Sequence, residues 1–146
     1  MPYLFDSNCF LRLAEKNGQQ GQVVLRAIRK LRAANETIHY TPQIIAEFWN
    51  VCTRPSYARG GLDLTTERTE RKVAVIEKYF SLLEDNVATF IEWRRLVREL
   101  GICGVKVHDA KLVASMTVHN VPNLVTLDDK DFQRFPSIKV VHPDSI

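Results

Sequence analysis

The sequence predicts an α/β fold of three layers, α/β/α, in which helices flank a central parallel sheet. Short apolar segments alternate with amphipathic helical segments along the chain. This alternation is typical of parallel sheets, whose strands are covered by helices on both faces. We expect strands at 2–6, 37–41, 80–84, 123–127 and 138–142.

The size and composition of the chain predict a single domain spanning residues 1–146. A chain of 146 residues can bury a sizeable core, and a hydrophobic fraction of 45% with a charged fraction of 25% is ordinary for a globular protein. Lysine and arginine number 20 against 17 aspartates and glutamates, so the net charge is +3. This balance is too mild to identify a polyanionic partner by itself.

Capping residues and breaks place three helices in the N-terminal half. Ser7 and Asn8 offer capping side chains for a first helix, which we expect to continue to residue 15. Asn17-Gly18 then breaks the pattern before a second amphipathic helix. Thr41-Pro42 combines a capping hydroxyl with a proline at the first helical position, so a third helix is expected to begin there and to end before residue 54.

Three further helices are expected in the C-terminal half, the first of them over 65–79. Asp85 or Asn86 can cap the second, which should stop at Gly101 because glycine readily adopts the left-handed conformation that ends many helices. The third runs to about His119, and Asn120 can end it in the same conformation. The core face of the second helix is expected to consist of Trp93, Leu96, Val97 and Leu100.

The cysteines indicate a reducing environment. Cys9, Cys52 and Cys103 are widely spaced and form no Cys-x-x-Cys pair. We interpret them as free thiols in or near the core of a cytoplasmic protein. No stretch approaches 18 uncharged apolar residues, so we expect no membrane-spanning helix.

Four acidic residues stand where the predicted fold would bury apolar side chains or end its strands. Asp6 follows the first strand, and Asp128 follows the apolar run 124–127. Glu47 and Asp109 each lie on the apolar stripe of a predicted helix. Because sites in open parallel sheets form beyond the carboxyl ends of the strands, the four carboxylates can converge there. Such a group of carboxylates would naturally bind a hard divalent cation, Mg²⁺ or Mn²⁺.

Each of these acids also has an ordinary structural explanation. Asp6 can cap the first helix, and Glu47 can lay its stem over apolar neighbours while its carboxylate reaches water. Asp109 in a first helical turn interacts favourably with the helix dipole, by about 0.3–1 kcal/mol. Asp128 can belong to a simple turn. It is the joint placement of the four residues that favours a metal site.

Four separated segments that contain these acids resemble the PIN-domain ribonucleases, especially the VapC-like toxins of toxin–antitoxin pairs. The segments are 4–8, 45–48, 107–114 and 124–132. In the last segment, the family's pattern places the metal-facing group two residues after the threonine, which selects Asp128 after Thr126. Asp131 is instead expected to close a turn or to cap a short helix. The resemblance covers nearly the whole chain and implies a PIN-like form of the three-layer fold.

The resemblance implies an endoribonuclease that hydrolyses RNA phosphodiester bonds with Mg²⁺ or Mn²⁺. The expected metal-binding and catalytic residues are Asp6, Glu47, Asp109 and Asp128, with Ser7, Asn8 and Thr126 orienting them. The expected RNA contacts are Arg12, Arg94, Arg95, Lys106 and Lys111. Arg94 and Arg95 can equally belong to a solvated helix face that is supported by Glu92–Arg95 and Arg95–Glu99 pairs.

The resemblance also implies partners, namely a second copy of the chain in a homodimer and a small antitoxin protein that blocks the acidic site. Two alternatives stay open. One is a nuclease that matures ribosomal or transfer RNA, and the other is a non-catalytic PIN-like binding module whose acids are structural. The intact set of four acids argues against the binding module, because the loss of one ligand would suffice to disarm such a site.

Overall fold

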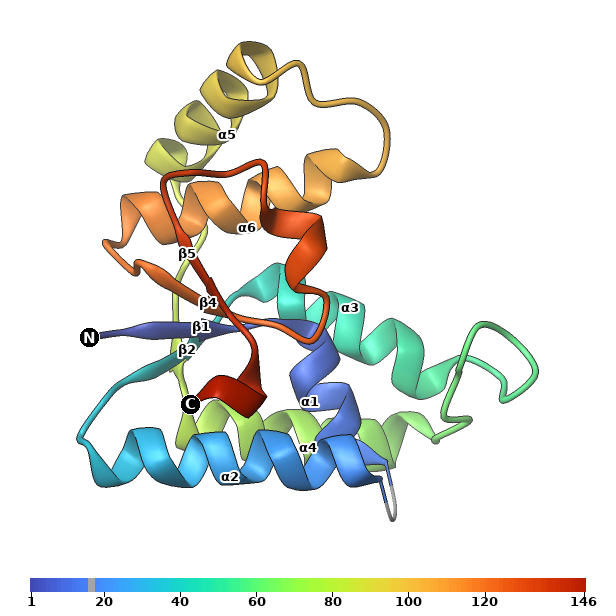
Figure 1. The fold of residues 1–146 in the computed structure, drawn as a ribbon. Coiled ribbons are helices and arrows are strands. Elements are labelled where there is room, and N and C mark those ends of the chain that lie inside the picture. Colours follow the sequence, from blue (N-terminus) through green and yellow to red (C-terminus); the bar gives the residue numbers. More distant parts are fainter. Residues whose placement is uncertain (16–17) are drawn as a thin grey trace.

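A parallel sheet forms the centre of the computed structural model, which describes residues 1–15 and 18–146 (Figure 1). Within these residues the strands are β1 (Tyr3–Phe5), β2 (Ile38–Tyr40), β3 (Ser81–Leu82), β4 (Asn123–Val125) and β5 (Lys139–Val141). They are hydrogen-bonded in the order β3-β2-β1-β4-β5, and every neighbouring pair is parallel. Each predicted strand is therefore present, and each is shorter than expected.

Helices cover both faces of this sheet. In the described ranges they are α1 (Ser7–Ala14), α2 (Gln19–Ala33), α3 (Pro42–Thr53), α4 (Thr66–Tyr79), α5 (Val87–Glu99) and α6 (Lys106–Val118). Figure 1 shows α2 and α4 along one face, and α6 with α5 outside it along the other. This arrangement confirms the predicted three-layer α/β/α fold. None of the helices in this part of the chain is long and apolar enough to cross a lipid bilayer.

Two helices begin at the caps that the sequence indicates. Thr41 is the N-cap of α3, and its hydroxyl accepts a hydrogen bond from the amide of Ile44 at 3.2 Å. Of the two candidates for the cap of α5, Asn86 is the one that the structure uses. Gly18 is the N-cap of α2, whereas Asn17 of the predicted break lies outside the described residues.

Two helices end in the left-handed conformation that their sequences predict. Gly101 follows the C-cap of α5 with a φ of 60°, and Asn120 follows the C-cap of α6 with a φ of 57°. Both residue types tolerate positive φ better than other residues do. These turns send the chain from α5 towards α6, and from α6 back into β4.

The core is deepest where β1 and β4 meet α6. The strand residues Leu4, Phe5, Leu124 and Val125 are fully buried, as expected for parallel strands that are covered on both faces. Helix α6 is buried over most of its circumference, because it lies between the sheet and α5 (Figure 1). The N-terminal turn of α6 lies on the side of the sheet where β1 and β4 end (Figure 1).

Two predictions about the segment that follows α5 are wrong. Leu100 was expected in the core, but its side chain is 42% exposed because it is the C-cap residue, after which the chain turns at Gly101. Cys103 was expected in or near the core, but it is exposed in the loop that leads to α6. Cys9 and Cys52 are buried as predicted.

We predict that replacing Thr41 by alanine lowers the free energy of unfolding by about 1–2 kcal/mol, as measured by urea denaturation. Thr41 is 2% exposed, so the amide of Ile44 cannot bond to water once the hydroxyl is lost. Thr65→Ala is the matched control, because Thr65 caps α4 through the amide of Arg68 at the same 3.2 Å but is exposed to solvent. Equal losses in the two variants would contradict the role given to burial.

Candidate active site

The sheet has a topological switch point between β1 and β4. The chain passes from β1 to β2 and β3 on one side, and then crosses to β4 and β5 on the other. Ligands of open α/β sheets bind beyond the carboxyl ends of the strands at such a point. The register pairs Phe5 with Val125, and the amide of Asp6 donates to the carbonyl of Val125 at 3.0 Å. Asp6 and Thr126 therefore leave the sheet side by side.

Asp6 is a buried carboxylate, with only 7% of the residue exposed. Its Oδ1 accepts from the amide of Ser7 at 2.8 Å, and its Oδ2 accepts from the hydroxyl of Thr126 at 2.9 Å. Burial raises the pKa of Asp6 from 3.8 to about 6, against the opposing effect of the Thr126 hydrogen bond. The negative charges of Glu47 and Asp109 raise this pKa further. Three of the predicted acids therefore interact electrostatically.

Glu47 reaches the same place from α3. The hydroxyl of Ser7 donates to Glu47 Oε2 at 2.8 Å, and Gln43 Nε2 donates to Glu47 Oε1 at 2.8 Å. Because Ser7 directly follows Asp6, the first of these bonds fixes the Glu47 carboxylate beside Asp6. Ser7 thus holds two acids at once, one through its amide and the other through its hydroxyl.

Asp109 approaches from the first turn of α6. The ammonium group of Lys106 lies 3.5 Å from Asp109 Oδ2 and 3.2 Å from Asp131 Oδ1. Partial burial raises the pKa of Asp109, the charge of Lys106 opposes this rise, and the charges of Asp131 and Glu47 add to it. Lys106 is therefore a cation placed directly at the acidic group.

Asp128 is exposed at the edge of the group, before the 3-10 helix η1 (Asp129–Phe132). Asn8 Nδ2 donates to Asp128 Oδ2 at 3.1 Å and to the hydroxyl oxygen of Thr126 at 3.0 Å. The same Thr126 oxygen accepts from the amide of Asp128 at 3.1 Å. The amide of Asp131 closes the turn of η1 by donating to the Asp128 carbonyl at 3.1 Å, which is one of the two roles expected for Asp131.

The acidic group suits a hard divalent cation by the chemistry of its donors. Carboxylate oxygens are the preferred ligands of Mg²⁺ and Mn²⁺, and a cation would relieve the mutual repulsion of Asp6, Glu47 and Asp109. As the side chains stand in the described ranges, no three His, Cys, Asp or Glu residues form a ready-made group for one ion. An ion would therefore have to draw the carboxylates together as it binds.

The basic residues predicted to contact RNA lie in different places. Lys106 is beside Asp109, and Lys111 lies further along α6, where its ammonium group is 3.6 Å from Asp85 Oδ2. On α1, Arg12 pairs with Glu15 at 2.6 Å.

Arg94 and Arg95 lie on α5, which packs outside α6 (Figure 1). Arg94 is exposed, and Arg95 forms ion pairs with Glu92 and Glu99 along the same helix. These pairs agree with the alternative that Arg95 belongs to a solvated helix face.

Gln43 belongs to the site, although it is absent from the residues that the sequence singled out. Its Nε2 donates to Glu47 Oε1 and also to the carbonyl oxygen of His108 at 2.9 Å. It thereby joins α3 to the first turn of α6, which carries Asp109. The detectable signal is its position four residues before Glu47, which places both residues on one helix face.

We predict that the wild-type protein loses stability relative to Asp6→Asn as the pH rises from about 4 to about 6. The pKa of Asp6 is about 6 in the folded protein and 3.8 ordinarily, so the folded state holds an extra proton between these values. The stabilisation that this proton provides disappears as the pH rises. The difference, on the order of 2–3 kcal/mol, is measured by urea denaturation of both proteins across this range.

Asp144→Asn is the control for this measurement, because Asp144 is exposed in the 3-10 helix η2 (Pro143–Ser145). We expect Asp144→Asn to retain the loss of stability with rising pH, because it keeps Asp6. A stability difference between wild type and Asp6→Asn that stays constant over this range would contradict the raised pKa of Asp6.

Comparison with protein families identifies one match. The model of the PIN domain matches residues 3–138, which include all four acids. No curated protein sequence matches the chain significantly.

Solved structures share the fold over most of the chain. VapBC2 from Rickettsia felis, bound to a DNA fragment from its promoter, is 18% identical with a TM-score of 0.71, covering 97% of this chain and 98% of that chain. VapBC-1 from nontypeable Haemophilus influenzae is 16% identical with a TM-score of 0.70, covering 98% of both chains. VapC20 from Mycobacterium tuberculosis, a toxin that cleaves the sarcin–ricin loop, is 13% identical with a TM-score of 0.55, covering 84% of this chain and 86% of VapC20.

Identities this low show a common fold, whereas the family model spans nearly the full length of the sequence. The chain therefore belongs to the PIN domain family, and its fold is that of the VapBC toxin–antitoxin structures.

Proposed function

We propose that this PIN domain is an endoribonuclease that depends on Mg²⁺ or Mn²⁺ and that serves as the toxin of a toxin–antitoxin pair. The observation that carries the proposal is the electrostatic coupling of Asp6, Glu47 and Asp109 at the switch point of the sheet. These acids come from three separate elements, and burial raises the pKa of Asp6. Titratable groups that are perturbed in this way are concentrated at functional sites.

In this proposal the ion is held by Asp6, Glu47, Asp109 and Asp128. The bound ion would supply an activated water and would neutralise charge on the scissile phosphate. A site made only of carboxylates suits this role, because Mg²⁺ prefers oxygen ligands. The ion also keeps several of its waters, so it needs few ligands from the protein.

The hydrogen-bonding residues of the site would position these acids. Thr126 and Ser7 hold Asp6, Ser7 also holds Glu47, and Asn8 orients Asp128. Such partners of ligating groups limit the orientations that the ligands can take. Ser7, Asn8 and Thr126 therefore reduce the reorganisation that is needed when an ion binds.

Basic side chains around the acids would hold the RNA backbone. Lys106 is adjacent to Asp109, where its ammonium group would contact a phosphate oxygen of the bound RNA. We propose that Lys111, further along α6, contacts another part of the bound RNA. Arg12, Arg94 and Arg95 stay predictions from the sequence.

The structural neighbours support the proposed partners. VapBC2 and VapBC-1 are toxin–antitoxin complexes, which supports a small antitoxin here, and VapC20 cleaves the sarcin–ricin loop. The homodimer stays a prediction from the sequence. We also propose that residues 1–146 form one domain of a cytoplasmic protein.

Expression in cells distinguishes a toxin from a housekeeping nuclease that matures RNA. A toxin arrests growth until its antitoxin is supplied, whereas a housekeeping nuclease does not.

We predict that millimolar Mg²⁺ or Mn²⁺ raises the melting temperature of the wild-type protein. An ion that binds only the folded state stabilises it by mass action. At an ion concentration about ten times the Kd, the melting temperature should rise by roughly 3–6 °C. The Asp6→Asn, Asp109→Asn double variant should show no such rise. A wild-type protein that is insensitive to both metals would contradict a shared ion site.

We predict that the purified protein cleaves a pool of structured RNA in the presence of Mn²⁺ and that chelation stops the reaction. Asp6→Asn and Asp109→Asn should each lower the rate by at least about 100-fold, because each removes a ligand charge while preserving shape. Asp144→Asn serves as the control and should cleave normally. Cleavage that persists in both site variants under chelation would refute the proposed nuclease site.

A further inference from the structure

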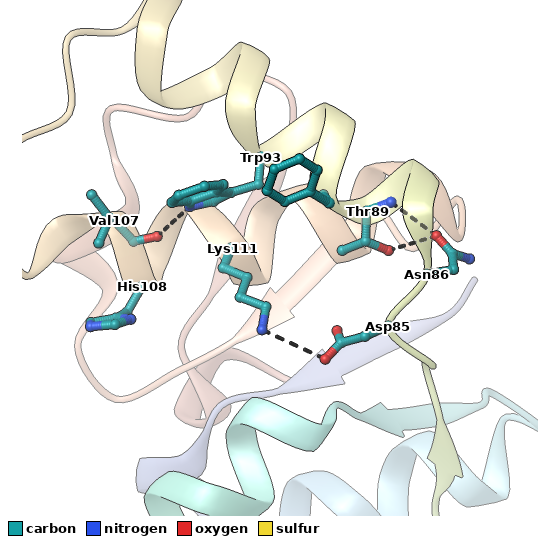
Figure 2. A pocket seen from close by; sticks show the side chains of 8 residues that line it. Asp85, Asn86, Thr89, Trp93, Val107, His108 and Lys111 are labelled. Carbon is teal, nitrogen blue, oxygen red and sulfur yellow. Dashed lines mark hydrogen bonds and ion pairs between the residues drawn. The ribbon is translucent and has the colours of Figure 1, made fainter.

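An open cavity of about 520 Å³ lies between α5 and α6 (Figure 2). Its walls are mainly apolar, formed by Phe90 and Trp93 from α5 and by Val107 from α6. Ligand sites in proteins usually measure roughly 300–1,000 Å³ and combine apolar walls with a few polar groups. The cavity therefore has the dimensions and lining of a binding site.

Two aromatic rings form one wall of this cavity. Trp93 packs partly against the core, as the sequence predicts, and its Nε1 donates to the carbonyl of Val107 at 2.8 Å, so the indole is fixed between the two helices. The ring of Phe90 lies 6.1 Å from that of Trp93 and is tilted by 36°, and Phe90 is 59% exposed. An accessible aromatic ring held at the edge of a cavity suits the stacking of a flat aromatic ligand.

The rim of the cavity offers both donors and acceptors of hydrogen bonds. Lys111 and Asp85 face each other there at 3.6 Å (Figure 2). Asn86 Oδ1 accepts from the amide and the hydroxyl of Thr89 at 2.9 and 3.0 Å, while Asn86 Nδ2 makes no hydrogen bond within the described part of the chain. An amide donor, an ammonium donor and a carboxylate acceptor can match the polar edge of a nucleobase.

A single side chain connects this cavity to the acidic site. His108 lines the cavity, and its carbonyl oxygen accepts from Gln43 Nε2, which also donates to Glu47 Oε1. The cavity wall at His108 and the carboxylate of Glu47 are therefore joined by the side-chain amide of Gln43. The cavity is thus adjacent to the acidic site, as the binding site for a base of the same RNA has to be.

We propose that this cavity binds an unpaired base of the RNA substrate, next to the cleaved bond. Phe90 stacks on the base, and Asn86, Asp85 and Lys111 contact its polar edge. The occupant is a base from a single-stranded segment, because a paired base has no free face or edge to offer. This inference rests on the proposed nuclease function, since it states how the substrate of the acidic site is held.

The main competing occupant is a second copy of the chain. Val87, Phe90 and Ile91 are exposed apolar residues on α5, and such a face can form a subunit interface. The charged and amide groups at the rim and the link through Gln43 to Glu47 favour the base. A subunit interface formed by the apolar face would need neither the polar groups at the rim nor the link through Gln43 to Glu47.

Phe90→Ala and Ile91→Ala form a matched pair for the test. Both residues are exposed apolar side chains on α5, at 59% and 61%, but only Phe90 lines the cavity. With an RNA whose cleaved bond has been mapped, we expect Phe90→Ala to raise KM on the order of 10-fold with little change in kcat, and Ile91→Ala to behave as wild type. An abasic residue at one position beside the bond should raise the wild-type KM equally and leave the KM of Phe90→Ala unchanged.

A second measurement follows binding without cleavage. Single-stranded RNA that carries 2-aminopurine at the same position is mixed with each protein in the presence of chelator. Stacking quenches the fluorescence of 2-aminopurine, so we expect quenching by wild type and by Ile91→Ala and its loss with Phe90→Ala.

The outcomes separate the inference from the function on which it rests. If wild type cleaves RNA but abasic residues at all flanking positions have no effect, the base site is wrong and the nuclease function stands. If wild type cleaves no RNA, the nuclease function is wrong, and quenching is then measured with single-stranded RNAs that carry 2-aminopurine at each position in turn. No difference between wild type and Phe90→Ala in any of them overturns the base site. If both variants lose activity together with their dimers in size-exclusion chromatography, the face is a subunit interface and the proposal is overturned.

Discussion

The burial of the Asp6 carboxylate between β1 and β4 is the constraint on which the rest of the site depends. Its charge is costly in this position, and the hydrogen bonds from Ser7 and Thr126 offset only part of the cost, since the pKa stays raised. The Thr126 bond depends on the β1–β4 register, whereas the Ser7 bond is a local contact at the start of α1. A slip of one residue would turn Thr126 to the opposite face of the sheet and leave the carboxylate without its strongest partner.

The other acids are tied to this centre by cross-links between elements, and no single element carries the whole site. Ser7 connects α1 to Glu47 on α3, and Gln43 connects α3 to the backbone of α6. Asn8 connects α1 to the segment after β4. Because each link joins two elements, a displacement of one helix would separate at least two carboxylates. The geometry of the site is therefore a property of the packed fold, and it responds to core mutations as well as to local ones.

Sequence patterns predicted the parts of this structure that are determined by residues close to one another in the chain. The cap at Thr41 and the left-handed turns at Gly101 and Asn120 depend on nearby backbone groups, so they could be identified from the residue types. For the α5 cap the residue types left two candidates, of which the structure uses Asn86. Asp6 could be placed because a strand end is visible as the end of an apolar run.

The features that the sequence did not reveal depend on how distant elements pack. The second bond of Gln43, to His108, exists only because the start of α3 meets the first turn of α6. Leu100 follows the apolar spacing of its helix, but a helical stripe does not show where the neighbouring helix stops covering it. The cavity between α5 and α6 is likewise set by the distance between the two helices, on which no residue pattern reports.

An acidic site that receives RNA must overcome repulsion between its carboxylates and the phosphates. Lys106 offsets part of the negative charge of the site by pairing with Asp109 and Asp131, and a divalent cation would offset more of it. Arg95 on α5 is already paired with two glutamates, so it adds little attraction. In the described part of the chain Arg12, Lys106 and Lys111 are also paired with carboxylates. Contacts to uncharged parts of the RNA therefore gain importance. Stacking of a base in the neighbouring cavity supplies such a contact, because its strength does not depend on the charge of the phosphates.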